Sequence, residues 1–149
     1  MLTHLKKTAR RLNLPFGDRR RTYNSRKAQE LGKWAEEQGR GDAFHTVAFK
    51  TYFVEGKNLA LIPVLEEITG RAGLDPSAVA VILAEHRYMD AVDRDWQRSR
   101  DLGVRAVPTF RLKGTTLTGA QSTTSLANLL ELKGIQRRTG FLRPTPHPL

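Results

Sequence analysis

The stretch GVRAVPTF (Gly103–Phe110) decides the fold of this chain of 149 residues. A small residue, valine, proline and threonine lead into a β-prone run here, which is typical of a proline at the start of a strand. The Val107–Pro108 bond suits a cis proline, because X-Pro bonds adopt the cis form at low cost. On these residues alone, an ordinary trans proline at a strand start is the alternative.

A β-hairpin is predicted at this loop. Two β-prone runs, Val107–Leu112 and Thr115–Thr118, are joined by the turn residues Lys113–Gly114, and this pattern indicates antiparallel strands. The stretch GAQ (119–121) then leads to Ser122 and Thr123, which can cap a last helix. The sequence therefore predicts a strand, a strand and a helix in its last third.

Helices are predicted throughout the first hundred residues. Apolar residues recur there at helical spacing, while glycines, prolines and capping residues mark the ends of the segments. Asn24 or Ser25 is expected to cap the second helix, and Asp75 to cap the fifth. The predicted helices lie at residues 2–12, 25–38, 41–56, 61–72, 77–86 and 88–102.

Two of these helices are expected to supply much of the core. The one over 41–56 carries the densest aromatic cluster of the chain, which predicts a core face and not a ligand pocket. The expected buried residues are Phe44, Val47, Ala48, Tyr52 and Phe53 in this helix, and Met89, Val92, Trp96 and Leu102 in the helix over 88–102.

The composition is strongly basic and contains no cysteine. The chain has 25 Lys and Arg against 15 Asp and Glu, a formal net charge of +10, which attracts polyanions without specificity. No helix-turn-helix spacing, zinc-ligand set or aromatic RNA-binding motif accompanies this charge, so nucleic acid is not expected as the main partner. The lack of cysteine excludes disulfides and thiolate catalysis by this chain.

Features that the sequence lacks bear on localisation and on metal binding. There is no run of about 18 apolar residues, which argues against a membrane span. The N-terminus lacks the apolar run of a signal peptide, so we expect a cytoplasmic chain. His4, His86 and His147 have no carboxylate or cysteine at metal-ligand spacing, so no metal site is expected, and His45 is interpreted as a packed or solvent-facing side chain and not as a catalytic base.

Several segments, taken in order, resemble the DsbA family of thiol-disulfide oxidoreductases. The similarity is strongest to the FrnE-like proteins, described as dithiol-disulfide isomerases and grouped with 2-hydroxychromene-2-carboxylate isomerases. It covers roughly residues 5–132. The similar segments are YNSRKAQEL (23–31), GDAFH (41–45), YFVEG (52–56), AGLD (72–75), GVRAVPTF (103–110) and GAQ (119–121).

The resemblance implies a fold that is mainly α with a β-hairpin. Residues 1–103 would form the helical insertion of a DsbA-like fold, and residues 104–133 the C-terminal ββα half of a thioredoxin fold. Residues 134–149 are expected to be a flexible, basic, proline-rich tail. The resemblance also favours the cis form of the Val107–Pro108 bond.

Family members begin with a strand, a Cys-X-X-Cys motif at the start of a helix, and a second strand, none of which this chain contains. We therefore expect no catalytic residue and no disulfide exchange by this chain alone. The resemblance implies that the cis-proline loop holds the substrate. The implied substrate-binding residues are Ala106, Val107, Pro108, Thr109, Gln121 and Ser122.

The strand Val107–Leu112 would pair with the missing first strand, so its edge is expected to be open. A homo-oligomer through this edge, or a separate N-terminal fragment bearing Cys-X-X-Cys, is the expected partner. No cofactor is expected, with glutathione as the alternative. Three interpretations follow: an incomplete DsbA-like oxidoreductase, a non-catalytic module that binds an extended peptide or a glutathione-like thiol, or a polyanion binder.

Overall fold

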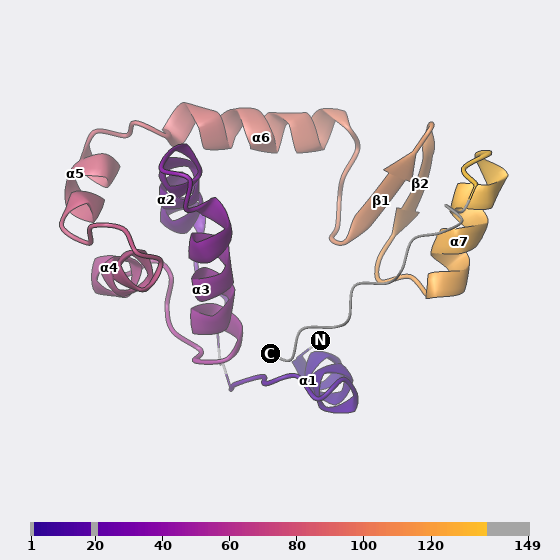
Figure 1. Cartoon of the computed structure of the whole chain (residues 1–149), viewed down its shortest axis with the longest axis horizontal. Helices are drawn as coiled ribbons and strands as arrows, with labels where there is room; N and C mark the ends of the chain where they lie inside the picture. Colours follow the sequence, from indigo (N-terminus) through magenta and orange to yellow (C-terminus); the bar gives the residue numbers. More distant parts are fainter. Residues whose placement is uncertain (1, 19–20, 137–149) are drawn as a thin grey trace. The chain divides into compact units, whose positions relative to one another are not determined.

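The computed structural model describes residues 2–18 and 21–136 (Figure 1). Over these residues the chain forms seven helices and one two-stranded antiparallel sheet, so the fold that is mainly α with a β-hairpin is confirmed. The tail expected over 134–149 lies outside the described residues from position 137 onward. None of the described helices is long and apolar enough to cross a membrane.

Contacts divide the chain into two compact units, Met1–Arg98 and Ser99–Leu149, and the boundary falls inside the sixth helix. The first unit is helical, and its helices begin and end within a few residues of the predicted positions. They are α1 (Leu2–Arg11), α2 (Arg26–Glu37), α3 (Gly41–Phe53), α4 (Ile62–Arg71), α5 (Ala78–Ala84) and α6 (Met89–Asp101).

Polar side chains close the starts of α2 and α5. The Asn24 Oδ1 atom accepts a hydrogen bond from the Arg26 N–H at 2.9 Å, whereas Ser25 makes no capping bond to the backbone. Before α5, the Asp75 Oδ1 atom accepts from the Ser77 N–H at 2.9 Å. Of the two residues predicted to cap α2, Asn24 therefore has this role, because its longer side chain reaches the first free amide.

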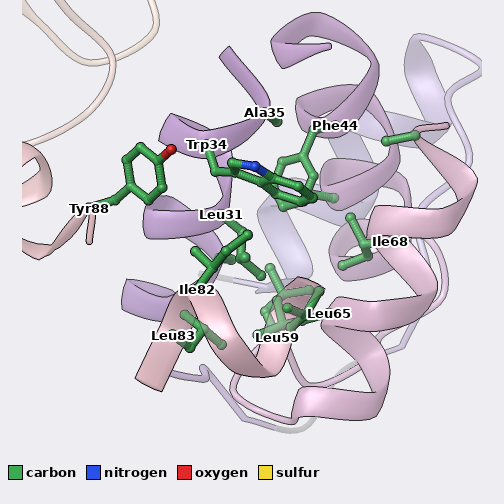
Figure 2. Packing of buried hydrophobic residues seen from close by; sticks show 14 residues of the cluster. Leu31, Trp34, Ala35, Phe44, Leu59, Leu65, Ile68, Ile82, Leu83 and Tyr88 are labelled. Carbon is green, nitrogen blue, oxygen red and sulfur yellow. The ribbon is translucent and has the colours of Figure 1, made fainter. Parts of the chain in front are cut away.

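The core of the first unit lies where α2, α3, α4 and α5 converge (Figure 2). Burial of a large apolar side chain stabilises a fold by ~1.5–3 kcal/mol, so this cluster is the main source of stability in the unit. The buried residues are Ala28, Leu31, Trp34 and Ala35 of α2, Phe44 and Ala48 of α3, Leu65 and Ile68 of α4, Val79, Ile82 and Leu83 of α5, with Leu59, Ala72 and Tyr88.

Tyr88 anchors the segment before α6 to the end of α2. Its side chain is buried, and its hydroxyl donates to the Glu37 Oε2 atom at 2.5 Å. Burial, followed by the hydrogen bond to this carboxylate, raises the pKa of Tyr88 above its ordinary value.

The predicted burial along α6 is wrong for Met89, Trp96 and Leu102, which are exposed, while Val92 is 1% exposed and belongs to the core. The reason lies in the chemistry of the contact between α2 and α6. The Trp96 ring lies 5.1 Å from the Arg26 guanidinium carbon, and its Nε1–H donates to the amide oxygen of Gln29 at 2.7 Å. This contact with polar side chains leaves 40% of the Trp96 surface exposed to solvent.

Salt bridges complete the contact between α2 and α6. The Arg26 Nη1 atom lies 2.7 Å from the Asp93 Oδ1 atom, and the Lys33 Nζ atom lies 2.7 Å from the Asp95 Oδ2 atom. The hydrogen bonds to these carboxylates raise the pKa of both Arg26 and Lys33. The apolar spacing of α6 predicted a helix correctly, but its neighbour presents polar side chains over much of that face.

The second unit contains the hairpin and the last helix. Strand β1 (Thr109–Leu112) pairs with β2 (Thr115–Thr118), with Thr109 opposite Thr118 and Leu112 opposite Thr115. Lys113 and Gly114 both have positive φ in the connecting turn, as a tight hairpin turn requires. Helix α7 (Thr123–Leu132) follows, and the Ser122 hydroxyl accepts from the Ser125 N–H as predicted for a cap.

The first strand begins at Thr109 and not at Val107 as predicted. Pro108 has no N–H to offer to a neighbouring strand, so the regular ladder starts after it. The Pro108 carbonyl still accepts a hydrogen bond from the Gly119 N–H at 2.8 Å.

Candidate substrate-binding loop

The loop before β1 is open to solvent. The Val107–Pro108 peptide bond is cis, which confirms the sequence-based expectation. Ala106, Val107 and Pro108 are all exposed, and Val107 keeps 86% of its surface accessible. An apolar side chain this exposed at a fixed loop is available for contact with another chain.

Two hydrogen bonds hold this loop in place. The Thr109 hydroxyl donates to the Ala106 carbonyl at 2.6 Å, and the Gly119 N–H donates to the Pro108 carbonyl at 2.8 Å. The first closes the loop on itself, and the second ties it to the residue after β2. Among the described residues, no hydrogen bond reaches the N–H or the carbonyl of Val107.

The hairpin register determines which backbone groups of β1 face outward. In an antiparallel pair, hydrogen-bonded and non-hydrogen-bonded residue pairs alternate. Since Pro108 and Gly119 share a hydrogen bond and Thr109 faces Thr118, the hydrogen-bonded positions of β1 are the even-numbered ones. The N–H and C=O groups of Thr109 and Arg111 therefore point away from β2.

These outward groups form an unpaired strand edge, which we call the outer edge of β1, defined by Thr109 and Arg111. The sheet has two strands in the part of the chain that the structure describes, so no third strand covers this edge there. Alternate residues of an extended chain present their backbone groups on the same side, at the spacing that a second extended chain matches.

The six predicted substrate-binding residues all lie at one end of the hairpin. The bond between Pro108 and Gly119 and the pairing of Thr109 with Thr118 bring the loop beside the end of β2, where Gln121 and Ser122 follow. Their substrate-binding role stays a prediction, and their observed contacts are internal. The Gln121 Nε2 atom donates to the Thr118 and Gly119 carbonyls at 3.0 and 3.2 Å, and the Ser122 hydroxyl caps α7.

Two arginines near the loop were not singled out from the sequence. Arg105 precedes the loop and is exposed, and Arg111 lies at the outer edge of β1. The Arg111 Nη1 atom donates to the Leu102 carbonyl at 3.2 Å, which ties the strand to the end of α6 within the second unit. Arg105, Val107, Thr109 and Arg111 fall at alternate positions of the sequence, and this spacing was the signal that could have identified the two arginines.

Side chains able to bind a metal are not grouped in this part of the chain. Within the described residues, no cluster of three or more His, Cys, Asp or Glu side chains is placed to hold an ion. The chemistry offered by the loop is therefore that of backbone hydrogen bonding, an apolar side chain and two nearby guanidinium groups.

Comparison with known proteins gives a family match. The family described as "DSBA-like thioredoxin domain" matches residues 1–131. The crystal structure of a probable DsbA oxidoreductase, SCO1869 from Streptomyces coelicolor, superimposes with a TM-score of 0.76 at 26% sequence identity. That match covers 94% of this chain and 62% of the Streptomyces chain.

A second relative matches over a shorter part of this chain. The uncharacterized protein YwbO of Bacillus subtilis (strain 168) is 27% identical over 88 residues, which is 58% of this chain and 44% of that protein. The chain thus spans less than two thirds of the length of either of these two proteins. The resemblance drawn from the sequence motifs is confirmed at the level of the DsbA-like family.

Proposed function

Because this chain belongs to the family of DSBA-like thioredoxin domains, we propose that it is the substrate-holding part of a DsbA-like thiol-disulfide oxidoreductase. It binds an extended polypeptide segment at the loop of Ala106–Thr109 and along the outer edge of β1. The single observation that carries this proposal is the pair of residues with outward backbone groups, Thr109 and Arg111, close in sequence to the exposed Val107 side chain.

An extended peptide satisfies the chemistry of this edge. Added as a further strand, it donates to and accepts from the backbone of Thr109 and Arg111, which gives affinity with little dependence on sequence. The exposed Val107 side chain adds an apolar contact at the end of the strand. Each backbone hydrogen bond contributes about 1 kcal/mol net, so a few such bonds suffice for weak and reversible binding.

Disulfide exchange requires a thiolate that attacks a disulfide sulfur. The 149 residues contain no cysteine, so the nucleophile has to come from outside them, such as a segment or a separate fragment bearing Cys-X-X-Cys. In that arrangement these residues hold the substrate and the segment bearing Cys-X-X-Cys supplies the redox chemistry. We expect the chain alone to leave a disulfide substrate unchanged in a thiol-release assay.

The proposal is tested with a pair of proline substitutions on the two sides of the hairpin. Arg111→Pro removes an N–H that points outward from β1, whereas Thr116→Pro removes an N–H that points outward from β2. Neither N–H belongs to the ladder between the strands, so the hairpin keeps its internal hydrogen bonds. Arg111→Ala separates the loss of the guanidinium from the loss of the backbone donor.

The measurement is a fluorescence anisotropy titration of the full chain with a labelled peptide of about six alternating Val and Thr residues. Loss of one hydrogen bond lowers affinity about fivefold, so we expect this loss in Arg111→Pro beyond that in Arg111→Ala. Thr116→Pro should bind as the unmodified chain does. Equal loss in both proline variants, or no binding by the unmodified chain, would refute the proposal.

Binding of a glutathione-like thiol at this loop and binding of polyanions to the basic surface stay predictions. The FrnE-like and isomerase grouping also stays a prediction, because the comparisons reach the DsbA-like family and no finer class.

A further inference from the structure

A half-enclosed apolar pocket lies in the first unit, and none of the residues assigned to substrate binding lines it. Its volume is about 410 Å³, and it is formed by α2, α3 and the segment before α2. Ala28 and Gln29 contribute from α2, Phe49 and Phe53 from α3, and Tyr23 from the preceding segment. Pockets of about 300–1,000 Å³ are the usual size for small-molecule sites.

Helix α3 carries two stripes of largely aromatic side chains, and one of them belongs to the core cluster. Phe44 and Ala48 are buried between the helices, and Tyr52 packs against the same cluster. The prediction that Phe53 belongs to this core is wrong, since Phe53 lies on the second stripe with Phe49. Successive members of a stripe are four residues apart, so each stripe runs along one side of the helix.

The second stripe lines the pocket together with the first, and of its members His45 and Phe49 are exposed while Phe53 is half-buried. Along it, the ring centroids of His45 and Phe49 are 6.5 Å apart, and those of Phe49 and Phe53 are 6.1 Å apart. Phe49 keeps 61% of its surface accessible. Rings at these separations form a continuous aromatic surface on which a further ring can pack edge-on or offset.

The end of the second stripe, at Phe53, is fixed by a close contact between the backbone of Gly17 and that of Phe53 and Val54. The Gly17 N–H donates to the Phe53 carbonyl at 2.9 Å, and a Cβ atom at Gly17 would lie 1.9 Å from the Val54 carbonyl oxygen. Only glycine fits there. The adjacent Phe16 ring is thereby held 6.1 Å from the Phe53 ring, which extends the aromatic surface by one further ring.

Three of the polar side chains at the pocket, those of Ser25, Gln29 and His45, already have partners within the protein. The Gln29 amide donates to the Ser25 hydroxyl at 2.9 Å and accepts from the Trp96 Nε1–H at 2.7 Å. The His45 Nε2 atom lies 3.5 Å from the Glu36 Oε1 atom. None of the described residues that line the pocket is Lys, Arg, Asp or Glu, although the whole chain has a net charge of +10.

From this chemistry we propose that the pocket binds a small, uncharged aromatic molecule of up to three rings. A charged ligand would lose its hydration without gaining an ionic partner among the lining residues. A flat neutral ring gains the area and the ring-ring contacts that the stripe of Phe49 and Phe53 offers. The inference is independent of the proposed peptide site, because its residues belong to a different unit.

The test uses the full chain and the neutral fluorescent probe N-phenyl-1-naphthylamine. We expect saturable binding of one probe per chain, and Phe49→Ala should weaken it at least about fivefold because a stacking partner is removed. Val81→Ala is the matched control, since Val81 is also an exposed apolar residue but lies on α5 away from the pocket. Equal weakening in both variants would overturn the proposal.

Competition establishes the charge of the ligand. Naphthalene should displace the probe, while naphthalene-2-sulfonate should not do so at the same concentration. Displacement by the sulfonate would overturn the neutral-ligand assignment.

Nuclear Overhauser contacts from the probe to the Tyr23 and Phe49 rings in the unmodified chain provide a readout that does not depend on any variant. Absence of these contacts would place the probe elsewhere and overturn the proposal. A concentration-dependent mass that falls in Phe49→Ala would show that the stripe is an interface between copies, which would also overturn it.

Discussion

Thr51 and Thr69 are both fully buried in the first unit, but their hydroxyls differ in partners. The Thr51 Oγ1 atom accepts a hydrogen bond from the Arg71 Nη1 atom at 3.2 Å. The Thr69 Oγ1 atom has no partner among the described residues. A buried hydroxyl without a partner loses its hydration and gains nothing in return, so the two residues should respond in opposite ways to loss of the oxygen.

We predict that Thr69→Val raises the free energy of unfolding by about 1 kcal/mol, whereas Thr51→Val lowers it by about 1 kcal/mol. Valine has nearly the shape of threonine, so each change removes the hydroxyl with little effect on packing. Urea denaturation of both variants and of the unmodified chain measures the difference. Destabilisation by Thr69→Val would mean that its hydroxyl has a stabilising partner.

The residues of the candidate loop could be named from the sequence because their signal is local. A valine and a proline before a β-prone run identify the loop, and Ser122 before a helical run identifies a cap. The outward direction of the backbone groups of Thr109 and Arg111 could not be assigned in this way. It depends on the register with β2, which shifts every group to the other side if it changes by one residue.

At the scale of elements, a salt-bridge network joins the end of α3 to α4. Its members are Glu55, Lys57, Glu67 and Arg71. The Arg71 Nη1 atom lies 2.8 Å from the Glu55 Oε1 atom, and the Lys57 Nζ atom lies 2.7 Å from the Glu67 Oε1 atom. Hydrogen bonds from Arg71 and Lys57 lower the pKa of Glu55, and hydrogen bonds led by Lys57 lower the pKa of Glu67.

This network predicts a loss of stability in acid. The folded-state pKa of each glutamate lies below its ordinary value of 4.5, so the contribution is complete above that pH and disappears as the pH falls through the folded-state pKa. The effect is modest because the side chains are substantially exposed to solvent. Urea midpoints from neutral pH down to about pH 3 measure it.

Two variants make this measurement specific. Arg71→Met removes the cation shared by the two carboxylates, so it should flatten the acid part of the stability profile. Glu66→Gln changes a neighbouring carboxylate that lies outside the network and should leave the profile as it is. An equally steep profile in Arg71→Met would exclude the network as the source of the acid dependence.

The helices and strands lie close to the positions predicted from the sequence. The burial of their side chains was predicted less well. Periodicity and caps placed each helix that the structure describes, because those signals act within a few residues. The burial of Trp96 was predicted wrongly because periodicity identifies an apolar face without identifying its neighbour. In the folded chain that neighbour is the polar side of α2, at Arg26 and Gln29.

At the scale of the whole molecule, the unpaired outer edge of β1 bears on assembly. An exposed edge with free N–H and C=O groups pairs readily with another strand. We predict that the chain self-associates through this edge, and that light scattering at micromolar concentration gives a mass near twice the 16.8 kDa of one chain. A monomeric mass at that concentration would refute it.

The same pair of variants identifies the surface. Arg111→Pro should return the mass to that of a monomer, while Thr116→Pro should not, because only the first removes a donor from the outer edge of β1. An excess of the Val-Thr peptide should also shift the unmodified chain to monomer. Peptide binding without any effect on mass would separate the peptide site from the surface used for self-association.

The sequence by itself determined the helices, the hairpin, the position of the proline loop and the absence of a thiol nucleophile among these residues. Each of these depends on residue type and on neighbours a few positions away. The tertiary structure alone decided which edge of β1 is open, which aromatic stripe of α3 faces the core, and that Trp96 rests on Arg26. These depend on contacts between segments distant in sequence, because burial is a property of the neighbour as much as of the residue.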